Sequence, residues 1–129
     1  NEQNSWTWKH IYESEAKMQK LAENWQNQKG KRDGELKQIL EQLGRELLLM
    51  SASDWQFLIS TGAARDYAEL RLTNHYSDFK KLSELADQKL QGQKLKPSEI
   101  EFLSACQIRD NLIPELDLNW FAKVDFPAE

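Results

Sequence analysis

The segment "RELLLMSASDWQFLISTG", residues 45–62, has the residue pattern best suited to binding or catalysis in this chain. An apolar run leads into Ser-Ala-Ser-Asp, and the indole of Trp55 follows directly. An aspartate beside an indole, at a break between helices, can form a small polar pocket with an apolar wall. Alternatively, Trp55 fills the core and Asp54 caps a helix. The pattern alone leaves both interpretations open.

Paired carboxylates are the second candidate, because glycoside chemistry uses two carboxyl groups about 5 to 10 Å apart. Asp54, Asp66 and Glu69 could in principle approach one another. Capping accounts for Asp54, however, a position in the first turn of a helix for Asp66, and exposure to solvent for Glu69. We therefore predict no catalytic residue in this chain.

The remaining reactive side chains are predicted to be structural. We expect His75 to be a half-buried helix residue that hydrogen-bonds a neighbour, and His10 to lie at the surface. Cys106 has apolar neighbours, which favours an inert thiol. Arg109 and Asp110 precede a proline corner, where we expect a buried ion pair that fixes the tail. The sequence has no phosphate loop and no zinc-ligand spacing, so neither a metal nor a cofactor is predicted.

Composition narrows the classes of partner. A chain of 129 residues can form one domain with a sizeable core. The net charge is −4, and 17 Lys and Arg residues are scattered among 21 acids, which argues against a nucleic-acid partner. No apolar run approaches the roughly 18 residues of a membrane helix, and the start of the chain lacks a signal-peptide core. Together with a single cysteine, these features predict a cytoplasmic protein. Five Trp residues favour a binding face.

Hydrophobic periodicity predicts helices along most of the chain and no pair of strands. The expected elements are a helix of about twenty residues from Trp8 to the sequence "QKGKRDG", a second helix from a cap at Asp33 to Ser51, a compact helical turn from Ser53 to Gly62, a long helix from Ala64 to Leu90, and a last helix from Ser98 to Ile108. The predicted fold class is all-α: a bundle of about four to five helices with an irregular C-terminal tail. Gly44, inside the second helix, is expected to permit a close helix contact.

Three segments carry a resemblance to a known family: "NSWTWKHIYESEAKM", "RELLLMSASDWQFLISTGAARDYAELRLTNHYSDFKKL" and "RDNLIPELD". They resemble the C-terminal all-helical domain of glycoside hydrolase family 57 1,4-α-glucan branching enzymes. The resemblance extends from Asn4 to about Phe121. It includes Arg-Glu-Leu-Leu-Leu, Ser-Asp-Trp, Asp-Tyr-Ala, an Arg and a His along one helix, and Arg-Asp-Asn, in this order.

The resemblance implies that residues 1–129 form a single helical domain, the C-terminal domain of a longer enzyme whose catalytic barrel is absent here. In that family, a distorted (β/α)7 barrel carries a glutamate nucleophile and an aspartate acid/base. It transfers an α-1,4-glucan segment to a 6-hydroxyl by a retaining mechanism, as in glycogen biosynthesis. Neither catalytic motif occurs in this chain, so no activity is expected of the domain alone.

The family's helical domain packs against the barrel and helps to close the cleft with aromatic residues that contact the glucan. The matching positions here are Trp6 or Trp8 in the opening segment, and Ser53, Asp54 and Trp55. The implied partners are α-1,4-glucan and the upstream barrel of the same chain. We expect a monomer that binds neither nucleic acid nor a membrane. The alternative is a free-standing helical module whose aromatic patch binds another protein.

Overall fold

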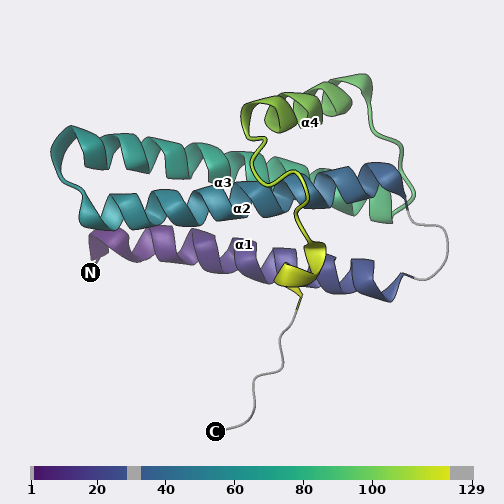
Figure 1. Cartoon of the computed structure of the whole chain (residues 1–129), viewed down its shortest axis with the longest axis horizontal. Coiled ribbons are helices and arrows are strands. Elements are labelled where there is room, and N and C mark those ends of the chain that lie inside the picture. Colours follow the sequence, from purple (N-terminus) through teal and green to yellow (C-terminus); the bar gives the residue numbers. More distant parts are fainter. Residues whose placement is uncertain (1, 29–32, 123–129) are drawn as a thin grey trace, which may run out of the picture.

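The computed structural model describes residues 2–28 and 33–122, with side chains from Trp6 onwards in the first helix. Its elements are α1 (Glu2–Asn27), α2 (Gly34–Ile59), α3 (Gly62–Leu90), α4 (Pro97–Arg109) and the short 3-10 helix η1 (Leu118–Phe121) (Figure 1). The described residues contain no strand, and those after α4 are irregular apart from η1. The predicted all-α fold with an irregular tail is confirmed. Of the sequence "QKGKRDG", which was predicted to end the first helix, residues 29–32 lie outside the described residues.

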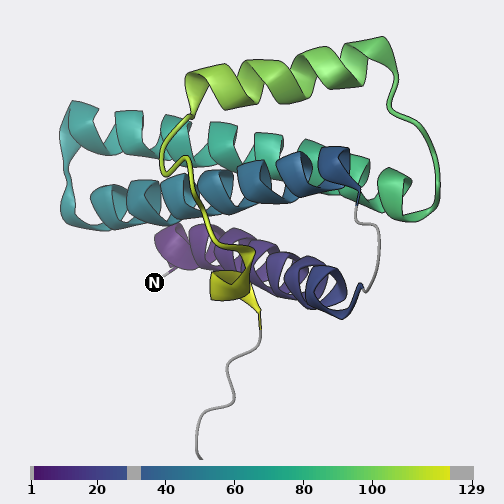
Figure 2. The ribbon, with the colours of Figure 1, turned by 45° about the vertical axis from the view of Figure 1, so that its right-hand side comes forward.

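Helices α2 and α3 form a long antiparallel pair, and the other two helices lie on opposite sides of it (Figures 1 and 2). α1 packs along one side, and the shorter α4 packs on the other. After α4 the chain crosses α2 and reaches α1, where η1 packs. The tail therefore joins the two outer layers of the bundle. None of the described helices is long and apolar enough to cross a membrane.

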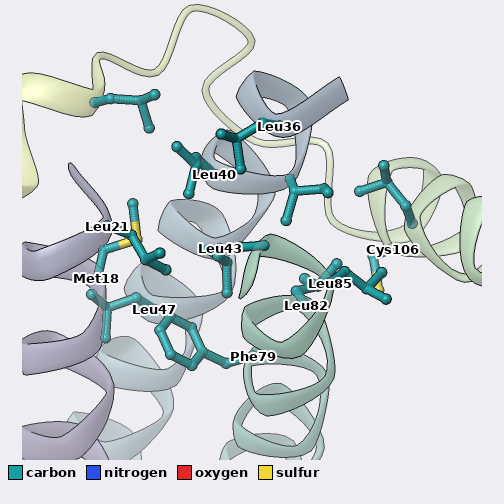
Figure 3. Close-up of a cluster of buried hydrophobic side chains, with 14 of the residues drawn as sticks. Met18, Leu21, Leu36, Leu40, Leu43, Leu47, Phe79, Leu82, Leu85 and Cys106 are labelled. Carbon is teal, nitrogen blue, oxygen red and sulfur yellow. The ribbon is translucent and has the colours of Figure 1, made fainter. Parts of the chain in front are cut away.

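Apolar side chains at three- and four-residue spacing meet between the helices (Figure 3). The labelled members are Met18, Leu21, Leu36, Leu40, Leu43, Leu47, Phe79, Leu82, Leu85 and Cys106. Full burial of one such aliphatic side chain contributes about 1.5 to 3 kcal/mol, so these contacts hold the layers together. Burial also raises the pKa of the Cys106 thiol to about 12. The prediction of an inert, buried cysteine is confirmed.

The predicted corner between Ser51 and Gly62 is wrong, because α2 continues through this segment to Ile59. The Ser51 hydroxyl donates to the Leu47 carbonyl at 3.0 Å, four residues back, as serine does inside a helix. Ser53 is buried within α2 and caps nothing. The chain turns after Ile59, and Gly62 opens α3 with a φ of +58°, a conformation that glycine adopts without strain.

The other predicted helix starts have different outcomes. Asp33 caps α2 as expected, accepting from the backbone N–H groups of Glu35 at 2.8 Å and Leu36 at 3.1 Å. Ser98, the predicted start of the last helix, is the second residue of α4 and does not cap it. Glu99 instead accepts from the backbone N–H of Lys96 at 2.8 Å, and α4 begins at the intervening proline.

Gly44 does permit a close approach, but the partner is the tail and not another helix. A β-carbon at this position would lie 2.8 Å from the ring of Phe121 and 3.1 Å from a methyl group of Leu116. Because Leu116 precedes η1 and Phe121 is its last residue, the absence of a side chain at Gly44 lets the tail lie against α2. The cost of glycine in a helix, about 1 kcal/mol relative to alanine, is thereby offset.

We expect Gly44→Ala to destabilise the fold by about 1 to 2 kcal/mol relative to Gly34→Ala, because overpacking opposes the gain in helix propensity. Gly34 is the matched control, since nothing lies within 4 Å of a β-carbon there. Urea unfolding of both variants measures the difference. Equal stability of the two variants would show that the tail does not depend on this contact.

Candidate functional site

The start of α1 lies beside the end of α2 (Figure 1). Both segments carry exposed aromatic or aliphatic residues. Trp8 and Tyr12 on α1 are 60% and 55% exposed, and Trp55 on α2 is 62% exposed. Leu58 and Ile59 follow at the end of α2 and are also exposed. These five residues are called the aromatic end below. Exposed apolar groups that gather in this way mark surfaces for a ligand or another protein.

Contacts between rings hold the aromatic end in place. Trp6 meets Phe57 edge to face, with 6.2 Å between ring centroids, which places the start of α1 against the end of α2. The guanidinium of Arg65, from α3, lies 3.9 Å from the Phe57 ring and so joins the third helix to this contact. Trp8 rests edge to face on Tyr12, at 4.5 Å. Two of the three tryptophans at this end therefore present their rings to solvent, while Trp6 is partly buried against Phe57.

The predicted site residues have unequal positions in this arrangement. Trp8 and Trp55 are exposed, Trp6 is partly buried, and Ser53 is buried at 6% exposure. Asp54 is half-buried, and its Oδ1 atom has no hydrogen-bond partner among the described residues. The interpretations of Trp55 as core and of Asp54 as a cap are wrong. Consecutive helix residues point in different directions, so Asp54 and Trp55 do not form the two walls of one pocket.

A buried polar cluster, which we call the charge cluster, lies at the middle of α2. It consists of Glu46, His75, Asp78, Arg109 and Asp110. Glu46 has no exposed surface, and its Oε1 atom lies 2.8 Å from His75 Nδ1 and 3.6 Å from Arg109 Nη2. The guanidinium of Arg109 also donates to the carboxylates of Asp78 and Asp110. The cluster thus joins α2, α3 and the end of α4.

The two innermost carboxylates have opposite pKa shifts. Burial raises the pKa of Glu46, and its hydrogen bonds with His75 and Gln42 only partly oppose this effect. Burial would also raise the pKa of Asp110, but the hydrogen bond from Arg109 and its positive charge hold that pKa below its usual value. Glu46 therefore favours its neutral form more than an exposed glutamate does, whereas Asp110 favours the carboxylate.

The geometry of the charge cluster suits a structural role. Nδ1 of His75 and one carboxylate oxygen each of Glu46 and Asp110 lie within 4.8 Å of one another, close enough to ligate an ion. The guanidinium of Arg109 already provides positive charge at these oxygens. Since Glu46 is fully buried, it cannot meet a substrate in solution. Arg109 pairs with Asp110 as predicted, but the pair is not fully buried, because the side chain of Arg109 is 52% exposed. The predicted hydrogen bond of His75 is confirmed.

Sequence reasoning missed Glu46, although a signal was present. Ile39, Leu43 and Met50 form one buried stripe of α2 at three- and four-residue spacing, and Glu46 occupies the position between the last two. A carboxylate at a core position requires buried partners. Arg45, next to Glu46, also has distant partners, because it donates to the carbonyls of Leu112, Ile113 and Pro114 in the tail.

We expect Glu46→Gln to change how stability depends on pH. Because the pKa of Glu46 is raised, the folded protein binds more protons than the unfolded chain between pH 4.5 and the raised value. Through that window, stability falls as pH rises. The variant lacks the titrating carboxyl group, so its free energy of unfolding should depend less steeply on pH from 4.5 upward. Urea titrations across this range measure it, with exposed Glu69→Gln as control. Parallel curves for Glu46→Gln and the wild type would contradict the assignment.

Together, the fold and the candidate site define an all-α bundle domain with an exposed aromatic surface and a tail fixed by buried charges. Comparison with known families gives a match over residues 10–121 to the family described as "1,4-alpha-glucan branching enzyme, C-terminal". The chain belongs to this family. The resemblance inferred from the sequence motifs is therefore confirmed.

Individual relatives agree with this assignment. The chain is 39% identical over 111 residues to a 1,4-alpha-glucan branching enzyme of Thermococcus kodakarensis, covering 86% of this chain and 15% of that protein. A GH57-type branching enzyme from Pyrococcus horikoshii has a similar structure, with a TM-score of 0.77 and 32% identity. The structure of the α-amylase AmyC from Thermotoga maritima is also similar, with a TM-score of 0.74 and 28% identity. Each structural match covers 96% of this chain and 22% of the other. The chain thus spans less than a quarter of these relatives.

Proposed function

We propose that residues 1–129 are the C-terminal domain of a longer 1,4-α-glucan branching enzyme. In this proposal the domain packs on an upstream catalytic barrel and helps to form the α-glucan-binding cleft. Family membership supports it, as does the small share of each relative that the chain covers. The proposed partners are therefore α-1,4-glucan and the barrel of the same chain.

The exposure of Trp8 and Trp55 at the aromatic end is the observation that carries the proposal. An indole has a flat apolar face that suits the C–H face of a glucose ring. Two exposed indoles within about two helical turns of the Trp6–Phe57 contact offer such faces on adjacent helices. Asp54 precedes Trp55 on α2, and its Oδ1 atom is buried without a hydrogen-bond partner among the described residues.

The proposed role is to position the glucan, and the chemistry is assigned to the barrel. The innermost carboxylate of this chain, Glu46, is sealed in the charge cluster, where water and substrate do not reach it. Positioning nonetheless has large kinetic consequences, since a displacement of about 1 Å can slow a reaction roughly a hundredfold. A wall of the cleft can therefore be essential without taking part in bond cleavage.

We expect the isolated domain to form no α-1,6 branches and to release no reducing ends from amylose. Debranching analysis and a reducing-end assay after prolonged incubation measure this. Turnover that persists through repurification and disappears on replacing Asp54 or Asp66 would overturn the assignment.

We expect Trp55→Ala and Trp8→Ala to reduce glucan transfer at least about tenfold in the full-length enzyme, because the glucan loses a stacking surface. Both rings are mostly exposed, so each change should cost far less stability than the about 3 to 5 kcal/mol of a buried Trp. Transfer rate and melting temperature are measured together. Ile108→Ala, exposed on α4, is the control. Unchanged transfer in both Trp variants would remove the cleft role and favour a module that binds another protein.

A further inference from the structure

A pocket of about 570 Å³ lies where the tail packs on the later half of α1 and the first half of α2. It is separate from the aromatic end. We call it the tail pocket. Figures 1 and 2 show η1 beside this part of α1. Residues with side chains suited to hydrogen bonding or stacking line it: Trp25, Gln26, Lys37, Glu41, Glu115 and Asn119. Its volume falls within the usual range for small-molecule sites.

Two amide side chains are held in fixed orientations at this pocket. The Gln26 Nε2 atom donates to Asn119 Oδ1 at 2.7 Å. This bond leaves the carbonyl oxygen of Gln26 as an acceptor and the amide group of Asn119 as a donor. The backbone N–H of Asn119 is itself held by Asp117 Oδ1 at 2.9 Å, which fixes the start of η1. The pocket thus offers a preset donor and acceptor side by side.

The other polar groups of the pocket are available to a ligand. Within residues 2–28 and 33–122, the side chains of Lys37, Glu41 and Glu115 take part in no ion pair or hydrogen bond. Trp25 supplies an apolar wall and is only 7% exposed. Trp120 adjoins Asn119 in η1 and is 57% exposed, so a second indole lies at this part of the tail.

The charges of the tail pocket select among ligand classes. One lysine stands against the carboxylates of Glu41, Glu115 and Asp117, which disfavours phosphates and other anions. The same lysine disfavours a metal ion, and the described group of residues that could ligate one lies elsewhere, in the charge cluster. Amides, carboxylates and an ammonium group around the indole of Trp25 match a neutral polyhydroxyl ligand, whose hydroxyls both donate and accept.

We propose that the tail pocket is a second α-glucan-binding site, separate from the aromatic end. The inference rests on the proposed function for its ligand class. Residues 8 and 25 are about 25 Å apart along α1 at 1.5 Å per residue, so the two sites occupy different parts of the domain. A long glucan held at the tail pocket raises the effective concentration of the remaining chain near the cleft. Short oligosaccharides gain nothing from this second contact.

The test uses the protein at its full natural length, with Gln26→Ala, Asn119→Ala and Trp120→Ala as separate variants. Affinity for amylose should fall about fivefold or more in each, with a smaller loss for maltotriose, because only a long chain engages both sites. Isothermal titration or affinity electrophoresis measures this, and cellohexaose serves as the β-linked control. Ile108→Ala should match the wild type. Circular dichroism checks that each variant is folded. Gln26→Ala lies on α1 and replaces no residue of η1.

If the folded Gln26→Ala and Trp120→Ala variants both bind amylose with wild-type affinity, the proposal that the tail pocket binds glucan is wrong. Equal losses for amylose and maltotriose would also overturn it, since they would exclude a second contact made by long chains only. The proposed function is tested separately by the transfer rate of Trp55→Ala. If that rate is unchanged while Gln26→Ala weakens amylose binding, the cleft role fails and the tail pocket stands. If Trp55→Ala slows transfer while Gln26→Ala binds amylose normally, the cleft role stands and only the second glucan site is ruled out.

Discussion

The burial of the Glu46 carboxylate is the constraint on which the arrangement of α4 and the tail depends. Removing a carboxylate from water costs several kcal/mol unless partners replace the lost hydration. Those partners come from three other places: Gln42 one turn earlier on α2, His75 on α3, and the Arg109–Asp110 pair at the end of α4. Because each partner belongs to a different element, satisfying one buried group fixes the relative positions of three helices.

The path of the tail follows from this fixed point. Beyond Asp110, the Arg45 guanidinium binds three successive carbonyls, and Ile113 adopts a φ of +47°, an unfavourable conformation for a β-branched residue. Such strain persists only where surrounding contacts determine the backbone. The redirected chain then lays Phe121 against Gly44 and brings Asn119 to Gln26. The tail pocket is therefore a product of the charge cluster, although none of the residues that line it belongs to that cluster.

The sequence predicted those features that depend on local patterns. Apolar periodicity located the helices, the cap at Asp33 was correct, and the motifs identified the family. The break near Ser53 was misplaced because serine can hydrogen-bond within a helix as well as cap one, and only the packing of α2 against α3 decides between them. Glu46 and Arg45 were missed because His75 and the tail carbonyls that bind them are 29 or more residues away in the sequence. Spacing along a helix carries no information on such contacts.

The charge cluster and the surroundings of the aromatic end differ in how completely their polar groups are satisfied. In the charge cluster, the buried carboxylate of Glu46 is paired with both His75 and Gln42. At the aromatic end, Oδ1 of Asp54 and Nδ1 of His10 are buried without partners among the described residues, even though His10 stacks on Tyr76. An unsatisfied buried polar atom costs about 1 to 3 kcal/mol. The polar groups near the aromatic end thus keep unused hydrogen-bonding capacity, whereas the buried carboxylate of the charge cluster is satisfied within the domain.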